Sequence, residues 1–155
     1  MIAIASTAIT LALVFYTIGV FAERRAGTLN LSHIIFFYMG LVFDTAGTAV
    51  MSVIARGNSA NLAHATTGLL AIILMIIHAA WATIAYAKKN PETLSRFHRM
   101  SIGVWLVWLV PYVCGMLMGI PALKLDSNVA FASAIATSVV AGLLIFGAEA
   151  KRLRQ

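Results

Sequence analysis

The apolar positions of this chain fall into five long runs, and short polar segments separate them. The runs cover about residues 2–22, 31–56, 60–87, 97–120 and 127–149. Each is near or above the roughly 20 residues with which a helix crosses a bilayer. The runs lack the two-residue alternation of a membrane β-barrel, so the pattern predicts an all-α membrane protein with five transmembrane helices. We expect residues 1–155 to form a single transmembrane domain.

The composition also indicates that the chain lies in a lipid bilayer. Hydrophobic residues make up 61% and charged residues 10% of the sequence, whereas a soluble domain carries roughly a quarter charged residues. The first run lacks the basic start and the cleavage site of a signal peptide, so we expect it to stay as a helix. Short connections force consecutive helices to lie antiparallel and adjacent in a bundle. We expect Thr93 or Ser95 to cap the fourth helix.

The net charge of +6 is explained by where the lysines and arginines lie relative to the membrane. If the N-terminus lies outside, nine of the 11 lysines and arginines fall on the cytoplasmic side. These nine are Arg24, Arg25, Lys88, Lys89, Arg96, Arg99, Lys151, Arg152 and Arg154. Only Arg56 and Lys124 fall on the outside. The positive-inside rule therefore predicts an outer N-terminus and a cytoplasmic C-terminus, and the charge needs no nucleic acid as a partner.

The four histidines are expensive to place in hydrocarbon unless something binds them. His64 and His78 lie fourteen positions apart in the third run. That spacing puts both imidazoles on nearly one face of a helix, about 21 Å apart along its axis. Two imidazoles at two depths of one helix are the arrangement with which a membrane b-type cytochrome holds two haems. His33 and His98 open the second and fourth runs near the cytoplasmic surface.

These depths predict one or two sites for haem b, with all four histidines as candidate iron ligands. An inner haem would take His78 together with His33 or His98, once helix tilt is allowed for. An outer haem on His64 needs a different second ligand, because no other histidine lies at that level. Met51 is the best-placed soft donor for it.

Each of these residues also has a structural interpretation. Met116 and Met118 are alternative donors for an outer haem. Gly68 shares a face with the histidines of the third run, where a small residue admits either a flat macrocycle or a neighbouring helix. His33 and His98 equally suit the membrane interface, where they would bind lipid headgroups or loop carbonyls.

Asp44 is the acidic residue predicted to lie far from both membrane surfaces. A carboxylate at that depth is destabilising unless it is protonated, paired or hydrogen-bonded. It is a candidate proton relay, or an acceptor that orients a histidine N–H group. The structural alternative is a protonated acid that is hydrogen-bonded to Thr48 or to a threonine of the first helix.

The second run carries a resemblance to a known family. Its segment Leu31–Thr48, with the sequence LSHIIFFYMGLVFDTAGT, and the downstream Met51 resemble the signature of the HsmA family. Members of this family are small haem-associated bacterial membrane proteins. The segment His64–Leu69 and the helix that carries His78 are also similar in layout. The resemblance implies haem binding in the bacterial inner membrane, with sequestration of haem and protection against haem or oxidative stress. His33 and Asp44 match the motif.

Three functions from different classes remain open. The first is a haem-binding protein that sequesters or buffers haem in the bilayer. The second is a di-haem electron carrier or a quinone-linked oxidoreductase, which would make the chain an enzyme. The third is a transporter or structural bundle in which the histidines and Asp44 form a proton or metal path. We favour the first, because the outer level offers one histidine and the runs show few of the breaks that transporters use. Quinone use, haem number and homo-oligomerisation stay open.

Overall fold

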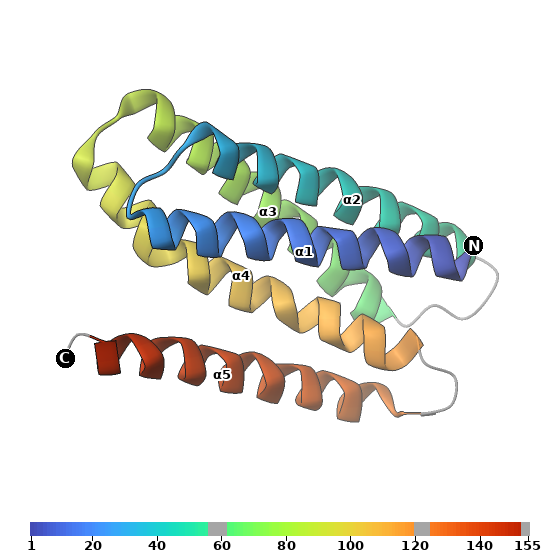
Figure 1. Cartoon of the computed structure of the whole chain (residues 1–155). Coiled ribbons are helices and arrows are strands. Elements are labelled where there is room, and N and C mark those ends of the chain that lie inside the picture. Colours follow the sequence, from blue (N-terminus) through green and yellow to red (C-terminus); the bar gives the residue numbers. More distant parts are fainter. Residues whose placement is uncertain (56–61, 120–124, 153–155) are drawn as a thin grey trace. The chain divides into compact units, whose positions relative to one another are not determined.

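The computed structural model describes residues 1–55, 62–119 and 125–152, with the backbone alone at residues 55, 62–65, 119 and 152. The regular structure of this described part is helical (Figure 1). Its helices are α1 Ile2–Ala26, α2 Leu31–Ala55, α3 Leu62–Lys88, α4 Pro91–Gly119 and α5 Ser127–Arg152. All five contain a stretch that is long and apolar enough to cross a membrane. The prediction of an all-α protein with five candidate membrane spans is confirmed.

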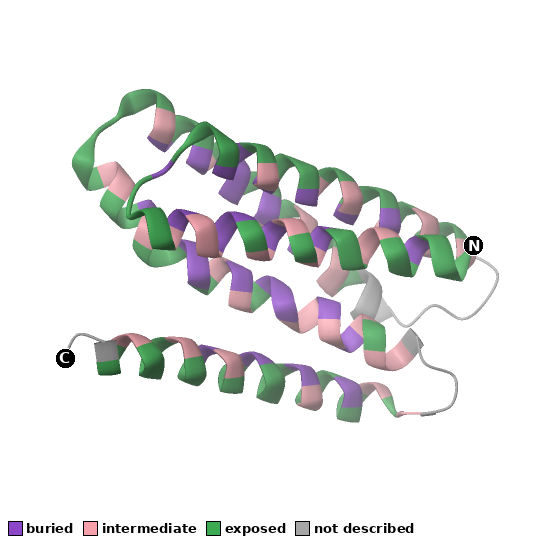
Figure 2. Ribbon diagram, in the orientation of Figure 1, coloured by how far each residue is buried: buried purple, intermediate pink, exposed green. Residues whose placement is uncertain are grey.

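Large apolar side chains lie exposed on every one of these helices. Ile4, Val42, Leu70, Val107 and Leu144, one from each helix, are between 61% and 70% exposed. Buried residues form only narrow bands along the helices (Figure 2). Apolar patches of this extent mark a surface that another apolar phase covers, and lipid is the phase that suits helices of this length.

By its contacts the chain divides into two compact units. The N-terminal unit, Met1–Trp105, comprises α1, α2, α3 and the first part of α4. The C-terminal unit, Leu106–Gln155, comprises the rest of α4 and α5. In the C-terminal unit the Ser138 hydroxyl donates to the Leu106 carbonyl at 2.6 Å, which ties α5 to α4. The single domain predicted from the sequence stays a prediction.

Glycines allow α1 and α2 to pack closely in the N-terminal unit. A side chain at Gly40 would collide with the Tyr16 ring, and one at Gly19 would lie 2.7 Å from the Phe37 ring. Aromatic side chains of one helix therefore rest directly on the backbone of the other. Helices in lipid associate through such close packing, because an apolar side chain gains no hydrophobic free energy when it exchanges lipid contacts for protein contacts.

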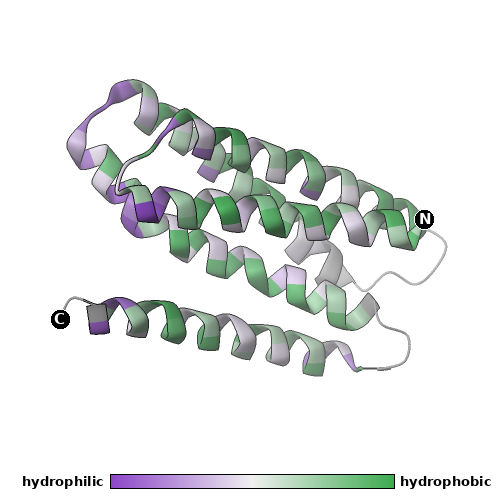
Figure 3. Cartoon of the chain, in the orientation of Figure 1, coloured by the Kyte–Doolittle hydropathy of each residue, from purple (hydrophilic) through white to green (hydrophobic). Residues whose placement is uncertain are grey.

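Polar pairs join α3 and α4 to these two helices. The Tyr38 hydroxyl on α2 lies 3.2 Å from the Thr83 hydroxyl oxygen on α3. The indole N–H of Trp105 on α4 donates to the Thr17 hydroxyl oxygen on α1 at 3.2 Å. Figure 3 shows that hydrophilic residues gather where α1 meets α2 and where α3 meets α4, at one end of this unit.

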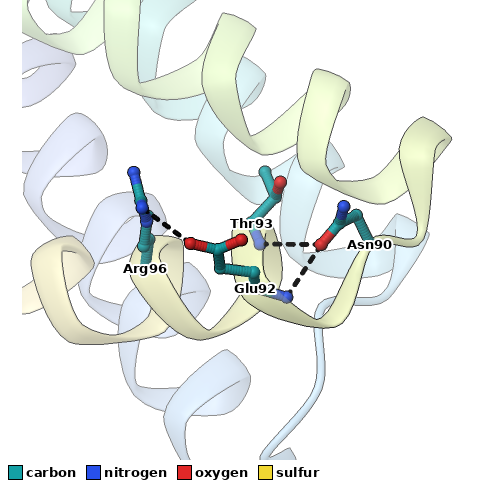
Figure 4. A network of polar contacts seen from close by, with 4 residues as sticks. All are labelled: Asn90, Glu92, Thr93 and Arg96. Carbon is teal, nitrogen blue, oxygen red and sulfur yellow. Dashed lines mark hydrogen bonds and ion pairs between the residues drawn. The ribbon is translucent and has the colours of Figure 1, made fainter.

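Two helix ends, the start of α4 and the end of α1, differ most from the predicted ones. The helix α4 begins at Pro91, and the side-chain oxygen of Asn90 caps it by accepting from the backbone N–H of Glu92 at 2.9 Å (Figure 4). Asn90 also accepts from the backbone of Thr93 at 3.4 Å, so Thr93 and Ser95 lie inside the helix and do not start it. Proline suits the first helical position, because its missing N–H would have no partner there.

The end of α1 also lies beyond the predicted residue 22. The helix runs to Ala26 and ends at Gly27, whose φ of 64° is left-handed and whose N–H bonds to the Glu23 carbonyl at 3.1 Å. Glycine adopts this conformation without strain, which is why it so often ends helices. Glu23 is consequently part of the helix and not of the connection that follows.

Candidate functional site

His78 is enclosed by aromatic side chains in the N-terminal unit. It lies on α3, is 2% exposed, and contacts Phe37 of α2 edge-on with ring centroids 4.8 Å apart. Phe97 of α4 stacks against the same imidazole, with ring centroids 4.9 Å apart. The Ser101 hydroxyl oxygen lies 3.4 Å from Nε2, whereas Nδ1 is buried without a hydrogen-bond partner among the described residues. A buried nitrogen without a partner is destabilising and calls for a further group.

Glu23 forms the second buried polar centre, near the end of α1. Its residue is 1% exposed, and its Oε1 lies 2.9 Å from Nδ1 of His98 on α4. The His98 side chain is 34% exposed, so the pair reaches from the interior toward the surface. The other carboxyl oxygen, Oε2, is buried and has no hydrogen-bond partner in the part of the chain that the structure describes.

The position of Glu23 follows from the periodicity of α1. The buried residues Tyr16, Gly19, Val20 and Glu23 are spaced three, four and seven positions from Tyr16, which places them on one face of the helix. Sequence reasoning missed Glu23, because its charge assigned it to a connection. The signal was present: continuing the spacing of the apolar face by one turn reaches it.

His33 is tied to the start of its own helix. Its Nδ1 accepts a hydrogen bond from the backbone N–H of Asn30 at 3.2 Å, and the residue is 5% exposed. This is the arrangement of a capping box, in which a side chain of the first turn bonds back to the residue before the helix. His33 also interacts electrostatically with Glu23.

The three histidines just described lie at one end of the N-terminal unit. His33 is four residues before Phe37 on α2, and His98 directly follows Phe97 on α4. The rings of Phe37 and Phe97 are 6.0 Å apart, and both contact His78. The end at which α1 meets α2 and α3 meets α4 thus gathers the residues that the sequence predicts for an inner site.

Asp44 is the other buried acid of this unit, and Tyr16 is a partner that the structure gives it. Asp44 is 5% exposed on α2, and the Tyr16 hydroxyl of α1 is within hydrogen-bond reach of its carboxyl group. The Tyr16 ring rests on Gly40, one turn before Asp44. The pair therefore belongs to the close contact between α1 and α2.

The outer haem site stays a prediction. The side chain of His64 lies outside the described residues, although its backbone belongs to α3. Met51 is half-buried near the end of α2, and a side chain at Gly68 would meet nothing within 4 Å. Met116 and Met118 belong to the C-terminal unit, where the Cys114 thiol lies 3.8 Å from the Met118 sulfur.

The chemistry of the donor set narrows the choice of cofactor. Among the described residues, no group of three or more His, Cys, Asp or Glu side chains is placed to hold a metal ion. A haem iron needs fewer, because four of its ligands come from the porphyrin and one or two from the protein. Nδ1 of His78, an imidazole nitrogen without a hydrogen-bond partner among the described residues and next to aromatic rings, fits that requirement.

Comparisons with known proteins found no match to this chain among family models, curated proteins or solved structures. The class of protein therefore follows from the fold and the buried residues alone. It is a multi-pass, all-helical membrane protein with buried histidine and acidic residues at one end of its N-terminal unit.

Proposed function

We propose that this protein binds haem b within the bacterial inner membrane and sequesters or buffers it there, which protects the cell against haem or oxidative stress. The observation that carries the proposal is His78, a buried imidazole whose Nδ1 has no partner among the described residues. Haem, when bound, would supply an iron centre, and His78 would hold it through this nitrogen. Phe37, Phe97 and Trp81 provide aromatic surface for an apolar macrocycle.

Exposed cations support an orientation of the N-terminal unit. Arg25, Lys88, Lys89 and Arg99 are exposed at the end that carries the histidines. Cations of this kind accumulate on the cytoplasmic side of membrane proteins. We place this end in the cytoplasm and the N-terminus outside, which makes the haem site an inner one. The variant Lys89→Cys should then react with a membrane-impermeant maleimide only after the cells are opened. Labelling in intact cells would reverse the orientation.

A holding role accounts for the described residues better than an electron-carrying role. Transfer across the bilayer needs a second haem near the outer surface, whereas the three histidines whose side chains the structure describes lie toward one end of the N-terminal unit. One firmly held haem suits storage and removal from solution. A second, equally stable haem that exchanges electrons rapidly with quinone would favour the oxidoreductase instead.

The proposal is tested with the purified full-length protein expressed with added haem. The wild type should show the spectrum of a b-type haem, with about one haem per chain by pyridine haemochrome. His78→Ala should retain less than about a tenth of that haem, because the ligand nitrogen is lost. Ile102→Ala is the matched control, since Ile102 is 1% exposed and its truncation opens a cavity without removing a nitrogen. Wild-type protein without haem, or His78→Ala with full haem content, would refute the proposal.

A further inference from the structure

We infer that Glu23 is the positioning residue for His98, and that the pair presents Nε2 of His98 as the second iron ligand of the inner site. This inference rests on the proposed function and identifies a ligand that the sequence left open between His33 and His98. It also gives a role to a buried acid for which the sequence predicts none.

The Glu23–His98 contact fixes the proton on the imidazole. An ionised carboxylate only accepts hydrogen bonds, so Nδ1 of His98, 2.9 Å from Oε1 of Glu23, carries the hydrogen. In a neutral imidazole the remaining nitrogen, Nε2, then has a free lone pair. Histidines that bind metals commonly donate their other N–H to a carboxylate, which sets the ring orientation and strengthens the ligand.

His33 has the opposite arrangement. Its Nδ1 accepts from the backbone N–H of Asn30, so in the neutral ring the hydrogen sits on Nε2. Neither nitrogen of this ring then offers a free lone pair. The same contact caps the start of α2, which gives His33 a structural role of its own. The two imidazoles that the sequence treats alike are therefore chemically different.

The contacts of His78 on α4 are made with the helical turn that carries His98. His78 contacts Phe97 and Ser101, which lie one residue before and three residues after His98. Residues three apart on a helix are surface neighbours, so His98 and Ser101 share one side of α4. His78 of α3 thus packs against the turn of α4 that carries His98.

The second carboxyl oxygen of Glu23 distinguishes this pair from an ordinary ion pair. Oε2 is buried without a partner among the described residues, in a side chain that is 2% exposed. Burying a carboxylate with half of its acceptors unfilled is destabilising, and such groups are retained where they have a task. By contrast, Glu92 at the same end is 71% exposed in its pair with Arg96.

The test compares Glu23→Gln and Glu23→Asp with Glu92→Gln, which removes an exposed acid of the same end. Each variant is purified at full length with haem. Glu23→Gln should retain haem but bind it roughly 10- to 100-fold more weakly. Its midpoint potential should rise, because a less basic imidazole stabilises ferric iron less. Glu23→Asp should restore part of the loss, and Glu92→Gln should match the wild type. His98→Ala should lose the six-coordinate, low-spin spectrum and bind carbon monoxide readily.

A second measurement determines, in the absence of haem, which nitrogen of His98 carries the hydrogen. In apo-protein with ¹⁵N-labelled histidine, His98 should carry its hydrogen on Nδ1, and Glu23→Gln should weaken that preference. If the wild type binds haem while Glu23→Gln and His98→Ala keep its spectrum and potential, this inference is wrong and the proposed function stands. If the wild type binds no haem, the proposed function itself fails. An unchanged His98 tautomer in Glu23→Gln would also overturn the positioning role.

Discussion

The two buried acids of the N-terminal unit, Glu23 and Asp44, lie on adjacent helices and have different partners. Glu23 faces an imidazole that is partly open to the surface, and one of its oxygens has no partner among the described residues. Asp44 lies beside the Tyr16 phenol, in a helix contact that glycine makes close. An acid beside a phenol and a glycine contributes to packing, whereas an acid beside an imidazole can orient a ligand.

Removing Asp44 should have the largest effect on folding. Asp44→Leu leaves the Tyr16 hydroxyl buried without this acceptor, which destabilises by about 1–3 kcal/mol, and the bulkier branched side chain strains the contact as well. We expect such a protein to lose haem because the helices that form the site no longer pack. Asp44→Asn keeps an acceptor and should retain both fold and haem. Thermal unfolding in detergent measures the difference. An Asn variant that binds haem but loses a redox activity would indicate a proton relay.

The glycine contact gives the next effect. Gly40→Ala should destabilise the protein by about 1–3 kcal/mol, because the new methyl group overlaps the Tyr16 ring. Gly103→Ala is its control, since a side chain there meets nothing within 4 Å. Alanine in a helix is favoured over glycine by about 1 kcal/mol, so the control should be neutral or stabilised. Equal unfolding temperatures for the two variants would show that the contact between Tyr16 and Gly40 does not stabilise the packing of α1 against α2.

The exposed acid should give the smallest effect. Glu92→Gln breaks a pair with Arg96 whose side chains are 71% and 63% exposed. Pairs of this kind on helices contribute about 0.3–0.5 kcal/mol, and salt screens them. The unfolding temperature should therefore move little and the haem content not at all. A loss as large as that of Glu23→Gln would show that the two acids act through one common network.

How far the sequence predicts this structure depends on the range of the forces involved. Five helices follow from apolar length, because the bilayer sets that length whatever the tertiary contacts are. The last turn of α1 and the first turn of α4 cannot be predicted from apolar length, because they contain charged residues and resemble loops. A capping residue such as Asn90 has to be recognised first. The burial of Asp44 can be predicted, because its position far from both ends of the second run places it deep in the membrane, where a carboxyl group needs a partner within the protein. The Glu23–His98 pair is not, because its members lie 75 positions apart and hydropathy contains no information on pairing.

The central claim is that one haem binds at the end of the N-terminal unit where His78 lies. Titration of haemin into apo-protein in lipid nanodiscs tests it most directly, with the Soret absorbance as the signal. The account predicts saturation at about one haemin per chain, with that tight site absent in His78→Ala and present in Ile102→Ala. Absence of a saturable site, or a tight site that His78→Ala leaves unchanged, would contradict it.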